Sequence, residues 1–278
     1  MTAPAVAVIG GGRVGLSLAR ALTLSGHPVE VLSRAERALR PPLVATLVDW
    51  DDAIGRTSIV LLAVPDDRID AVAHRLAATG HIGANHTVLH ISGRLDRSAL
   101  AALEPTGAAL GSLHPLQTFR DDDGNGVLAG HPAILEGDPR AVAAARELAE
   151  AIGMDPILEI PAAGKPAYHA AAVFASNYLV VLVALASRLG REAGLAATWQ
   201  VFLPLMRQTL AHLTDHDPAA SLTGPIRRGD VGTVRAHLAA LEEPVRGLYA
   251  ALGREALELA APGLEPNVAA ELRTVLKD

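Results

Sequence analysis

The sequence contains no cysteine, and this absence excludes a disulfide framework and any thiolate metal site. The first twelve residues, MTAPAVAVIGGG, also lack the basic segment that opens a secretory signal. The segment 121–126, DDDGNG, opens like a calcium loop, but its twelfth position is Pro132 instead of a bidentate glutamate. We therefore expect a cytoplasmic protein, and we predict no metal site.

Aromatic residues are scarce, at 3% of the chain, and no block of lysine or arginine stands out. Half of the 278 residues are hydrophobic, mostly alanine and leucine, which favours close-packed helices over a β-sandwich. The net charge of −6 argues against a nucleic-acid partner. The apolar run Ala170–Ala186 reaches only the lower limit for a membrane span and is interrupted by Ser176 and Asn177. It predicts a buried central helix and no membrane partner.

A glycine motif follows the first apolar strand pattern, Ala5–Ile9, and precedes a helical pattern that ends at Gly26. In this G-x-G-x-x-G segment, Gly10 allows the tight turn, Gly12 lets a pyrophosphate approach the backbone, and Gly15 lets the helix pack on the strand. The helix N-terminus attracts phosphate. The spacing therefore predicts a dinucleotide site that uses Gly10, Gly12, Arg13, Val14 and Gly15.

The second strand pattern, Val29–Leu32, indicates which nicotinamide cofactor is bound. NAD-binding folds usually place an acidic residue near the end of this strand, but Glu30 lies too early. The strand is followed by Ser33, Arg34 and Arg37, which can bind a 2′-phosphate. We therefore predict NADP(H) in preference to NAD(H). The alternative is a solvated basic start of a helix.

Further strand patterns end in residues that belong at the ligand-binding edge of a parallel sheet. Thr57–Val64 leads to Ala63, Val64 and Pro65, which should border the nicotinamide ribose. Thr87–Ile91 ends at Ser92, and Ala108–Leu113 ends at His114, a residue type suited to proton transfer near neutral pH. The alternative for His114 is a loop histidine that is bonded to backbone.

The segment Lys165–Asn177, KPAYHAAAVFASN, begins the longest apolar stretch. On a helix, Lys165, His169 and Asn177 would share one broad side, because they are four and eight residues apart. A cation, an imidazole and an amide can polarise a carbonyl or imine, move a proton and hold a substrate. The alternative is a helix start with exposed polar residues.

The order of elements predicts an α/β chain with an N-terminal Rossmann domain, a doubly wound parallel sheet, at residues 1–161. An all-α domain at 162–278 follows, because every later segment is helical in pattern. We expect a homodimer, since the central helix offers more apolar surface than one helical layer can bury. The active site is expected between the domains.

Five segments together resemble the Rossmann-like, short-subunit dehydrogenase-like proteins whose C-terminal half is domain of unknown function 2520. They are the glycine motif, AVPDD at 63–67, HPLQTF at 114–119, YHAAAVFASN at 168–177 and LTGPIRRGD at 222–230. The resemblance implies membership of the 6-phosphogluconate dehydrogenase-like superfamily and a nicotinamide cofactor. In the β-hydroxyacid dehydrogenases of that superfamily, asparagine follows the helical lysine by four residues, whereas here His169 follows Lys165.

We interpret the chain as an NADP(H)-dependent oxidoreductase that acts on a small C=O or C=N group of a 2-keto acid or a cyclic imine. Lys165 or His169 is the expected general acid, and His114 competes for that role. Asn177 would orient the substrate and Ser92 would lie near the nicotinamide. The alternative is a non-catalytic NADPH-binding regulator, which would keep the same glycine loop.

Overall fold

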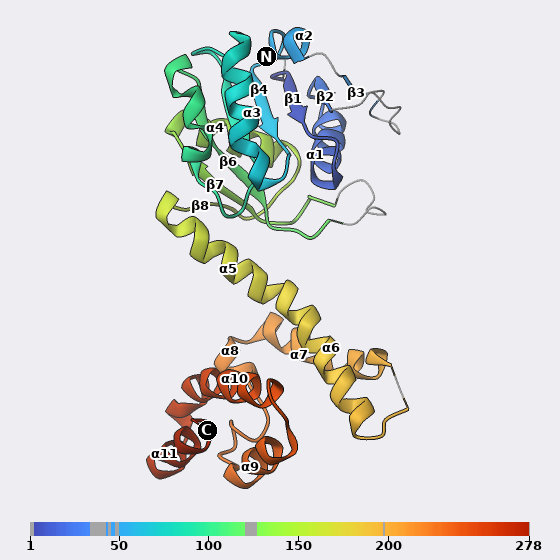
Figure 1. The fold of residues 1–278 in the computed structure, drawn as a ribbon, viewed down its shortest axis with the longest axis vertical. Helices are drawn as coiled ribbons and strands as arrows, with labels where there is room; N and C mark the ends of the chain where they lie inside the picture. Colours follow the sequence, from blue (N-terminus) through green and yellow to red (C-terminus); the bar gives the residue numbers. More distant parts are fainter. Residues whose placement is uncertain are drawn as a thin grey trace. The chain divides into compact units, whose positions relative to one another are not determined.

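The structure is a computed structural model that describes residues 3–33, 43, 46–47, 50–119, 127–196 and 198–277. The chain forms two compact units, Met1–Val180 and Val181–Asp278 (Figure 1). The first unit therefore extends beyond Pro161, where the sequence places the domain boundary, and it includes the helix that carries Lys165.

The first unit is built on an eight-stranded sheet with the order β3-β2-β1-β4-β5-β6-β7-β8. All neighbouring strands are parallel except β6 and β7, which are antiparallel. The order reverses at β1, as in a doubly wound fold. The strands are β1 (Val6–Ile9), β2 (Val29–Leu32), β3 (Thr46–Leu47), β4 (Ile59–Leu62), β5 (Thr87–His90), β6 (Ala109–Pro115), β7 (Ala133–Gly137) and β8 (Ile157–Glu159).

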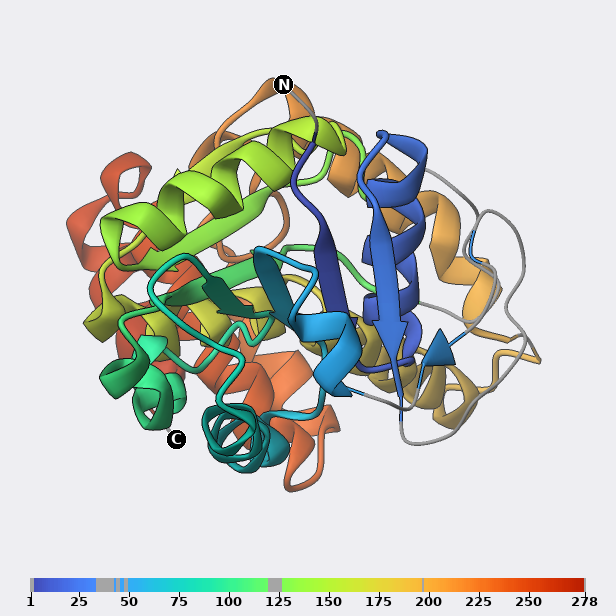
Figure 2. The same cartoon turned by 90° about the horizontal axis from the view of Figure 1, so that it is seen from above.

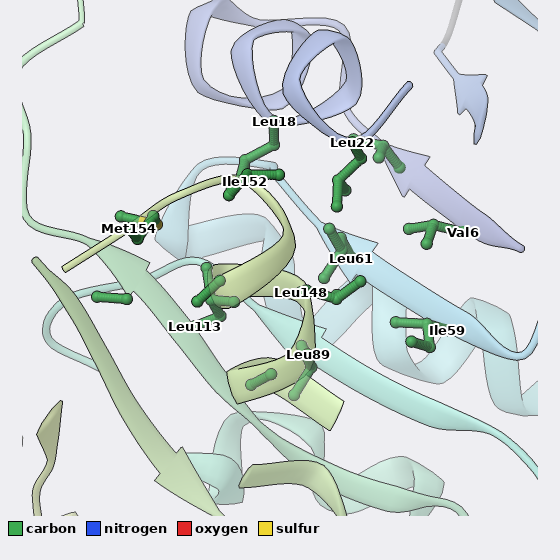
Figure 3. Close-up of a cluster of buried hydrophobic side chains, with 14 of the residues drawn as sticks. Val6, Leu18, Leu22, Ile59, Leu61, Leu89, Leu113, Leu148, Ile152 and Met154 are labelled. Carbon is green, nitrogen blue, oxygen red and sulfur yellow. The ribbon is translucent and has the colours of Figure 1, made fainter. Parts of the chain in front are cut away.

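The strands are continuous apolar runs because helices cover both faces of the sheet. One core joins alternate strand residues to α1 (Arg13–Leu24) and α4 (Pro139–Ala151). The other joins the opposite strand faces to α2 (Trp50–Ile54), α3 (Asp66–Thr79) and the 3₁₀ segment η1 (Arg97–Thr106). Figure 2 shows α4 and α3 on opposite sides of the strands, and Figure 3 shows Leu18 and Leu22 of α1 in the first core.

The predicted fold class, a Rossmann sheet followed by helices, is confirmed. Three elements differ from the sequence-based expectation. The short β3 and α2 were not predicted, and β7 runs antiparallel to β6. The described residues between β6 and β7 contain no helix, and antiparallel neighbours do not require the helical crossover that parallel strands need.

The second unit is helical and has a small core of its own. The core includes Ile226, Val234, Leu257, Leu272 and Leu276. These residues come from the segment before α9, from the last three α-helices and from the residue that follows α11. After the end of α6 at Glu192, the described helices of this unit are α7 (Leu203–Asp215), α8 (Pro218–Ser221), α9 (Val231–Ala240), α10 (Val245–Ala260) and α11 (Pro266–Val275), with 3₁₀ turns η3 (Trp199–Phe202) and η4 (Ala261–Gly263).

The long apolar segment forms two helices, α5 (Lys165–Ala175) in the first unit and α6 (Asn177–Glu192), which contains the boundary after Val180, with a break at Ser176. A 3₁₀ turn, η2 (Ala162–Gly164), precedes α5. By length and composition, the span Ala162–Glu192 could cross a membrane, and only 6% of its apolar window is buried in the structure. The prediction of a buried central helix is therefore wrong for the single chain, in which Phe174 and Val180 are 65% and 69% exposed.

Candidate functional site

The glycine loop between β1 and α1 has the geometry of a dinucleotide cradle. A methyl group at Gly10 would lie 2.2 Å from the carbonyl oxygen of Ala63, and one at Gly15 would lie 2.1 Å from the carbonyl oxygen of Gly10. Gly10 also has a φ of 123°, which favours glycine. At Gly12, by contrast, a methyl group would have no described neighbouring atom within 4 Å. The loop is therefore closely packed on the protein side and open at Gly12.

Helix α1 starts beside this open position. Gly12 is its N-cap residue, and no described side chain forms a hydrogen bond to the cap. Val14 packs against the core from the first turn. Arg13 donates from Nη1 to the carbonyl oxygen of Phe119 at 3.2 Å, which ties the loop to the segment that follows β6. A pyrophosphate at Gly12 would meet the positive end of the α1 dipole.

The predicted 2′-phosphate site is described only in part. Ser33 follows β2 directly and is partly buried at the carboxyl end of the strand. Arg34 and Arg37 lie outside the described residues, as does the 121–126 turn. Glu30 accepts hydrogen bonds from Arg56 at 3.1 and 3.3 Å, so it is paired away from a ribose hydroxyl.

A cluster of three rings forms at the carboxyl end of β6. Nδ1 of His114 lies 2.7 Å from the hydroxyl of Tyr168 on α5, and the two rings meet edge to face. The His114 and His169 ring centroids are 6.2 Å apart. Both imidazoles touch Gly93, where a Cβ would lie 2.7 Å from Nδ1 of His169 and 2.9 Å from Nε2 of His114. We call His114, Tyr168, His169 and Gly93 the ring cluster.

His169 contributes a buried polar atom to the ring cluster. Its Nδ1 is buried and has no hydrogen-bond partner among the described residues. Buried polar atoms in folded proteins are nearly always paired with protein, water or ligand. The atom therefore marks a position where a bound molecule or water would complete the site.

The protonation of the ring cluster follows from its burial. Burial lowers the pKa of His114 to about 4, and the positive charge of Lys165 acts in the same direction. Burial also raises the pKa of Tyr168 to about 12. At neutral pH the pair is therefore a neutral imidazole beside a protonated phenol. A proton can pass between the two groups along the hydrogen bond that joins them.

Lys165 is placed differently from the sequence-based expectation. It is the first residue of α5 and is fully buried, with its Nζ donating to the backbone oxygen of Ser92 at 2.8 Å and to Oγ of Ser112 at 2.9 Å. Burial lowers the pKa of Lys165 to about 8, opposed by the carboxylates of Glu136, Asp66 and Asp96. The ammonium therefore lies inside the protein behind the Ser92–Gly93 turn.

The predicted cofactor-side residues lie at the ends of β4 and β5. Ala63 packs against the glycine loop, and Ala63 and Val64 are half-buried while Pro65 is exposed. The Ser92 side chain is 4% exposed and donates to Asp66 at 2.8 Å while accepting from the backbone amides of Arg94 and Leu95. Its hydroxyl is thus used to hold the turn after β5.

Lys165, His114 and His169 are brought together, but Asn177 is exposed beyond the break at Ser176. Sequence reasoning passed over Tyr168, although it lies three residues after Lys165 and so on the same side of a helix. It also missed Ser112 and Glu136, whose signal is a polar residue within an otherwise apolar strand.

Two family models match the sequence. The model of the Rossmann-like domain matches residues 2–115, and the model of a domain of unknown function, DUF2520, matches residues 131–256. The chain is a Rossmann-like protein with a C-terminal DUF2520 domain. The second match begins just before β7, so the DUF2520 domain of this protein includes the last strands of the sheet. No protein with a curated description matches the sequence.

Solved structures share the fold of this Rossmann–DUF2520 protein at low identity. A candidate NADP oxidoreductase from Bacteroides fragilis is 23% identical over 93% of this chain and 99% of its own, with a TM-score of 0.72. An imine reductase from Myxococcus stipitatus, solved with NAD⁺, is 18% identical over 97% and 99%, with a TM-score of 0.61. A pyrroline carboxylate reductase from Plasmodium falciparum, solved with NADP, is 13% identical over 100% and 97%, with a TM-score of 0.55.

His90 and His114, whose pKa values are both lowered, predict a loss of stability in acid. His90, which donates to the Asp96 carbonyl and accepts from the Ser92 amide, also has its pKa lowered by burial, to about 4. Because the unfolded chain binds these protons from about pH 6.5 downward, the free energy of unfolding should fall between pH 6.5 and 4, by up to about 3 kcal/mol per histidine. Urea unfolding of the wild type and of His114→Gln measures this. If the free energy of unfolding fell equally in the wild type and in His114→Gln, the lowered pKa of His114 would be contradicted.

Proposed function

We propose that this protein is an NADP(H)-dependent oxidoreductase that reduces a small C=O or C=N group. The observation that carries the proposal is that one edge of the sheet carries both a glycine loop open at Gly12 and a ring cluster that holds a protonated tyrosine beside a neutral histidine. The printed descriptions of the similar structures support it, since they name reductases and nicotinamide cofactors.

The residues of the first unit fit a nicotinamide dinucleotide. Its pyrophosphate would lie at Gly12 and the first turn of α1, next to Arg13 and Val14. The half-buried Ala63 and Val64 would border the nicotinamide half at the carboxyl end of β4. The cofactor supplies the hydride, and the protein supplies placement and the proton.

Within the ring cluster, we assign the proton transfer to the His114–Tyr168 pair. Reduction of a C=O or C=N group adds a hydride to carbon and a proton to oxygen or nitrogen. Tyr168 is protonated at neutral pH and can give that proton, while Nδ1–H of His114 at 2.7 Å can stabilise the phenolate that remains. We assign substrate binding to His169, because its Nδ1 has no hydrogen-bond partner among the described residues.

Two substrate classes fit this chemistry. A cyclic imine needs a proton donor, and Tyr168 of the ring cluster offers one. A 2-keto acid also needs a cation for its carboxylate. In the first unit Arg94 lies close to the turn that carries Gly93, although it contacts Asp66 at 3.6 Å. The structure of this unit therefore favours the imine.

The cofactor preference for NADP(H) rests on the residues after β2. Ser33, Arg34 and Arg37 offer a hydroxyl and two guanidinium groups to a 2′-phosphate. The pairing of Glu30 with Arg56 supports the same preference, because it removes the acidic side chain of β2 from a ribose.

Gly12→Ala should separate cofactor binding from folding. Because no described atom lies within 4 Å of the new methyl group, the variant should keep wild-type stability while losing NADPH affinity by tenfold or more. Gly83→Ala, which is equally open and remote from the loop, is the matched control. Fluorescence titration and thermal unfolding measure both effects. Wild-type affinity in Gly12→Ala would contradict the placement of the pyrophosphate.

Tyr168→Phe should lower turnover by about 10²–10⁴-fold without changing NADPH affinity, because it removes the proton donor and little else. Tyr178→Phe, at a tyrosine that is 47% exposed, is the control. Oxidation of NADPH against pyrroline-5-carboxylate and 2-ketopantoate provides the assay. Full turnover in Tyr168→Phe would exclude this donor.

The same assay tests the alternative function. NADPH binding without oxidation by any member of a broad imine and keto-acid panel would favour a regulator.

We also propose that two copies of the chain associate through α5 and α6. These helices expose large apolar side chains, and an exposed apolar face of this kind marks an interaction site. A second copy of the chain presents the same face, so the two copies can cover each other. Sedimentation should show a dimer, and Val180→Glu should dissociate it. A monomeric wild type that binds neutral lipid vesicles would show instead that the apolar span meets a membrane.

A further inference from the structure

A row of polar side chains crosses the sheet beneath Lys165. His90 of β5 pairs in register with Ser112 of β6, and Ser112 pairs with Glu136 of β7. All three side chains are buried, at 0%, 0% and 3% exposure. Side chains at paired positions of neighbouring strands point to the same face. The row therefore lies on one face of the sheet, beside the described core of α3 and η1.

Lys165 completes this row with a buried cation. The chain has two lysines, Lys165 and the exposed Lys277, and Lys165 is the largest of the fully buried side chains. An ammonium group only donates hydrogen bonds, so Ser112 accepts from Nζ and its own hydrogen is free to point to Oε2 of Glu136 at 3.3 Å. With the hydrogen in this direction, the Ser112 hydroxyl links the ammonium group of Lys165 to the buried carboxyl group of Glu136.

Lys165 is connected to two of the chain segments that carry the ring cluster. Its Nζ holds the carbonyl oxygen of Ser92, and Gly93 is the next residue. Its own backbone begins α5, which carries Tyr168 one turn later and then His169. One buried side chain therefore joins the turn after β5, strand β6 and the start of α5.

We propose that Lys165 is a positioning residue, which holds Gly93 and the first turn of α5 so that Tyr168 and His169 face His114. This role rests on the proposed function of the ring cluster, and it replaces a direct catalytic role for the ammonium. The hydrogen bonds of Nζ end at Ser92 and Ser112, inside the protein, and the side chain has no exposed surface.

The cation also acts on His114 through space. The titratable groups that face His114 are Tyr168, Lys165 and His169 from α5, His90 from β5 and Asp66 from α3. After burial, the charge of Lys165 has the largest effect in lowering the pKa of His114. The groups that face Lys165 are Glu136, Asp66 and Asp96. Loss of the cation should therefore raise the pKa of His114, whereas removal of a charge far from the ring cluster should leave it unchanged.

The test compares Lys165→Met, which keeps the length of the side chain and removes its charge, with Lys277→Met, which removes the same charge from an exposed position. Imidazole NMR signals of the full chain, with His114 assigned from His114→Gln, give the midpoint of its titration. We expect an increase of at least half a pH unit in Lys165→Met and no change in Lys277→Met. An unchanged midpoint in a folded Lys165→Met would overturn the proposal.

A second variant keeps the proposal testable if Lys165→Met does not fold. Ser112→Ala removes the hydroxyl between Lys165 and Glu136 and leaves both charges in place. With two lysines in the chain, their side-chain NMR signals are readily resolved, and Lys277→Met assigns them. We expect the Lys165 midpoint to shift by at least half a pH unit. An unchanged midpoint would contradict the linkage of Lys165 to Glu136 through Ser112. Neither NMR titration requires cofactor or turnover, so both test Lys165 independently of the proposed function.

Discussion

Burial of the sheet on both faces is the constraint on which the rest of this structure depends. Helices α1 and α4 cover one face, and α2, α3 and η1 cover the other, so most side chains along the central strands are buried and apolar. Polar chemistry is therefore confined to the carboxyl ends of the strands, where chain segments leave the sheet. The glycine loop after β1, the turn after β5 and His114 at the end of β6 all occupy that edge.

The buried row His90–Ser112–Glu136 is the exception to this rule, and it shows how a polar group is kept inside a sheet. Each member has a hydrogen-bond partner, and the charge of Lys165 lies over the row. A buried charge without such partners would be costly. Both this row and the ring cluster contact α5, so the packing of one helix start determines how the phenol and the imidazoles meet.

Sequence patterns were sufficient for β1, β2, β4, β5 and β6, for the glycine loop and for the position of His114, but not for the short β3. Continuous apolar runs and glycine spacing depend on neighbours close in the chain. The same patterns could not show that Lys165 is buried, because its partners Ser92 and Ser112 are 73 and 53 residues away. They also missed the pairing of Tyr168 with His114, and they placed Asn177 in a continuous helix that breaks at Ser176. These features depend on how α5 docks on the sheet and on the antiparallel entry of β7.

The most direct test of the account is titration of the purified protein with NADPH and with NADH, followed by nicotinamide fluorescence. Saturable binding of NADPH, tighter than that of NADH, is the predicted result. At about 100 times its dissociation constant, NADPH should stabilise the native state by about 2.7 kcal/mol, which thermal unfolding would detect. A preference for NADH would remove the 2′-phosphate assignment to Ser33, Arg34 and Arg37. Binding of neither nucleotide would contradict the cofactor site and the oxidoreductase proposal that depends on it.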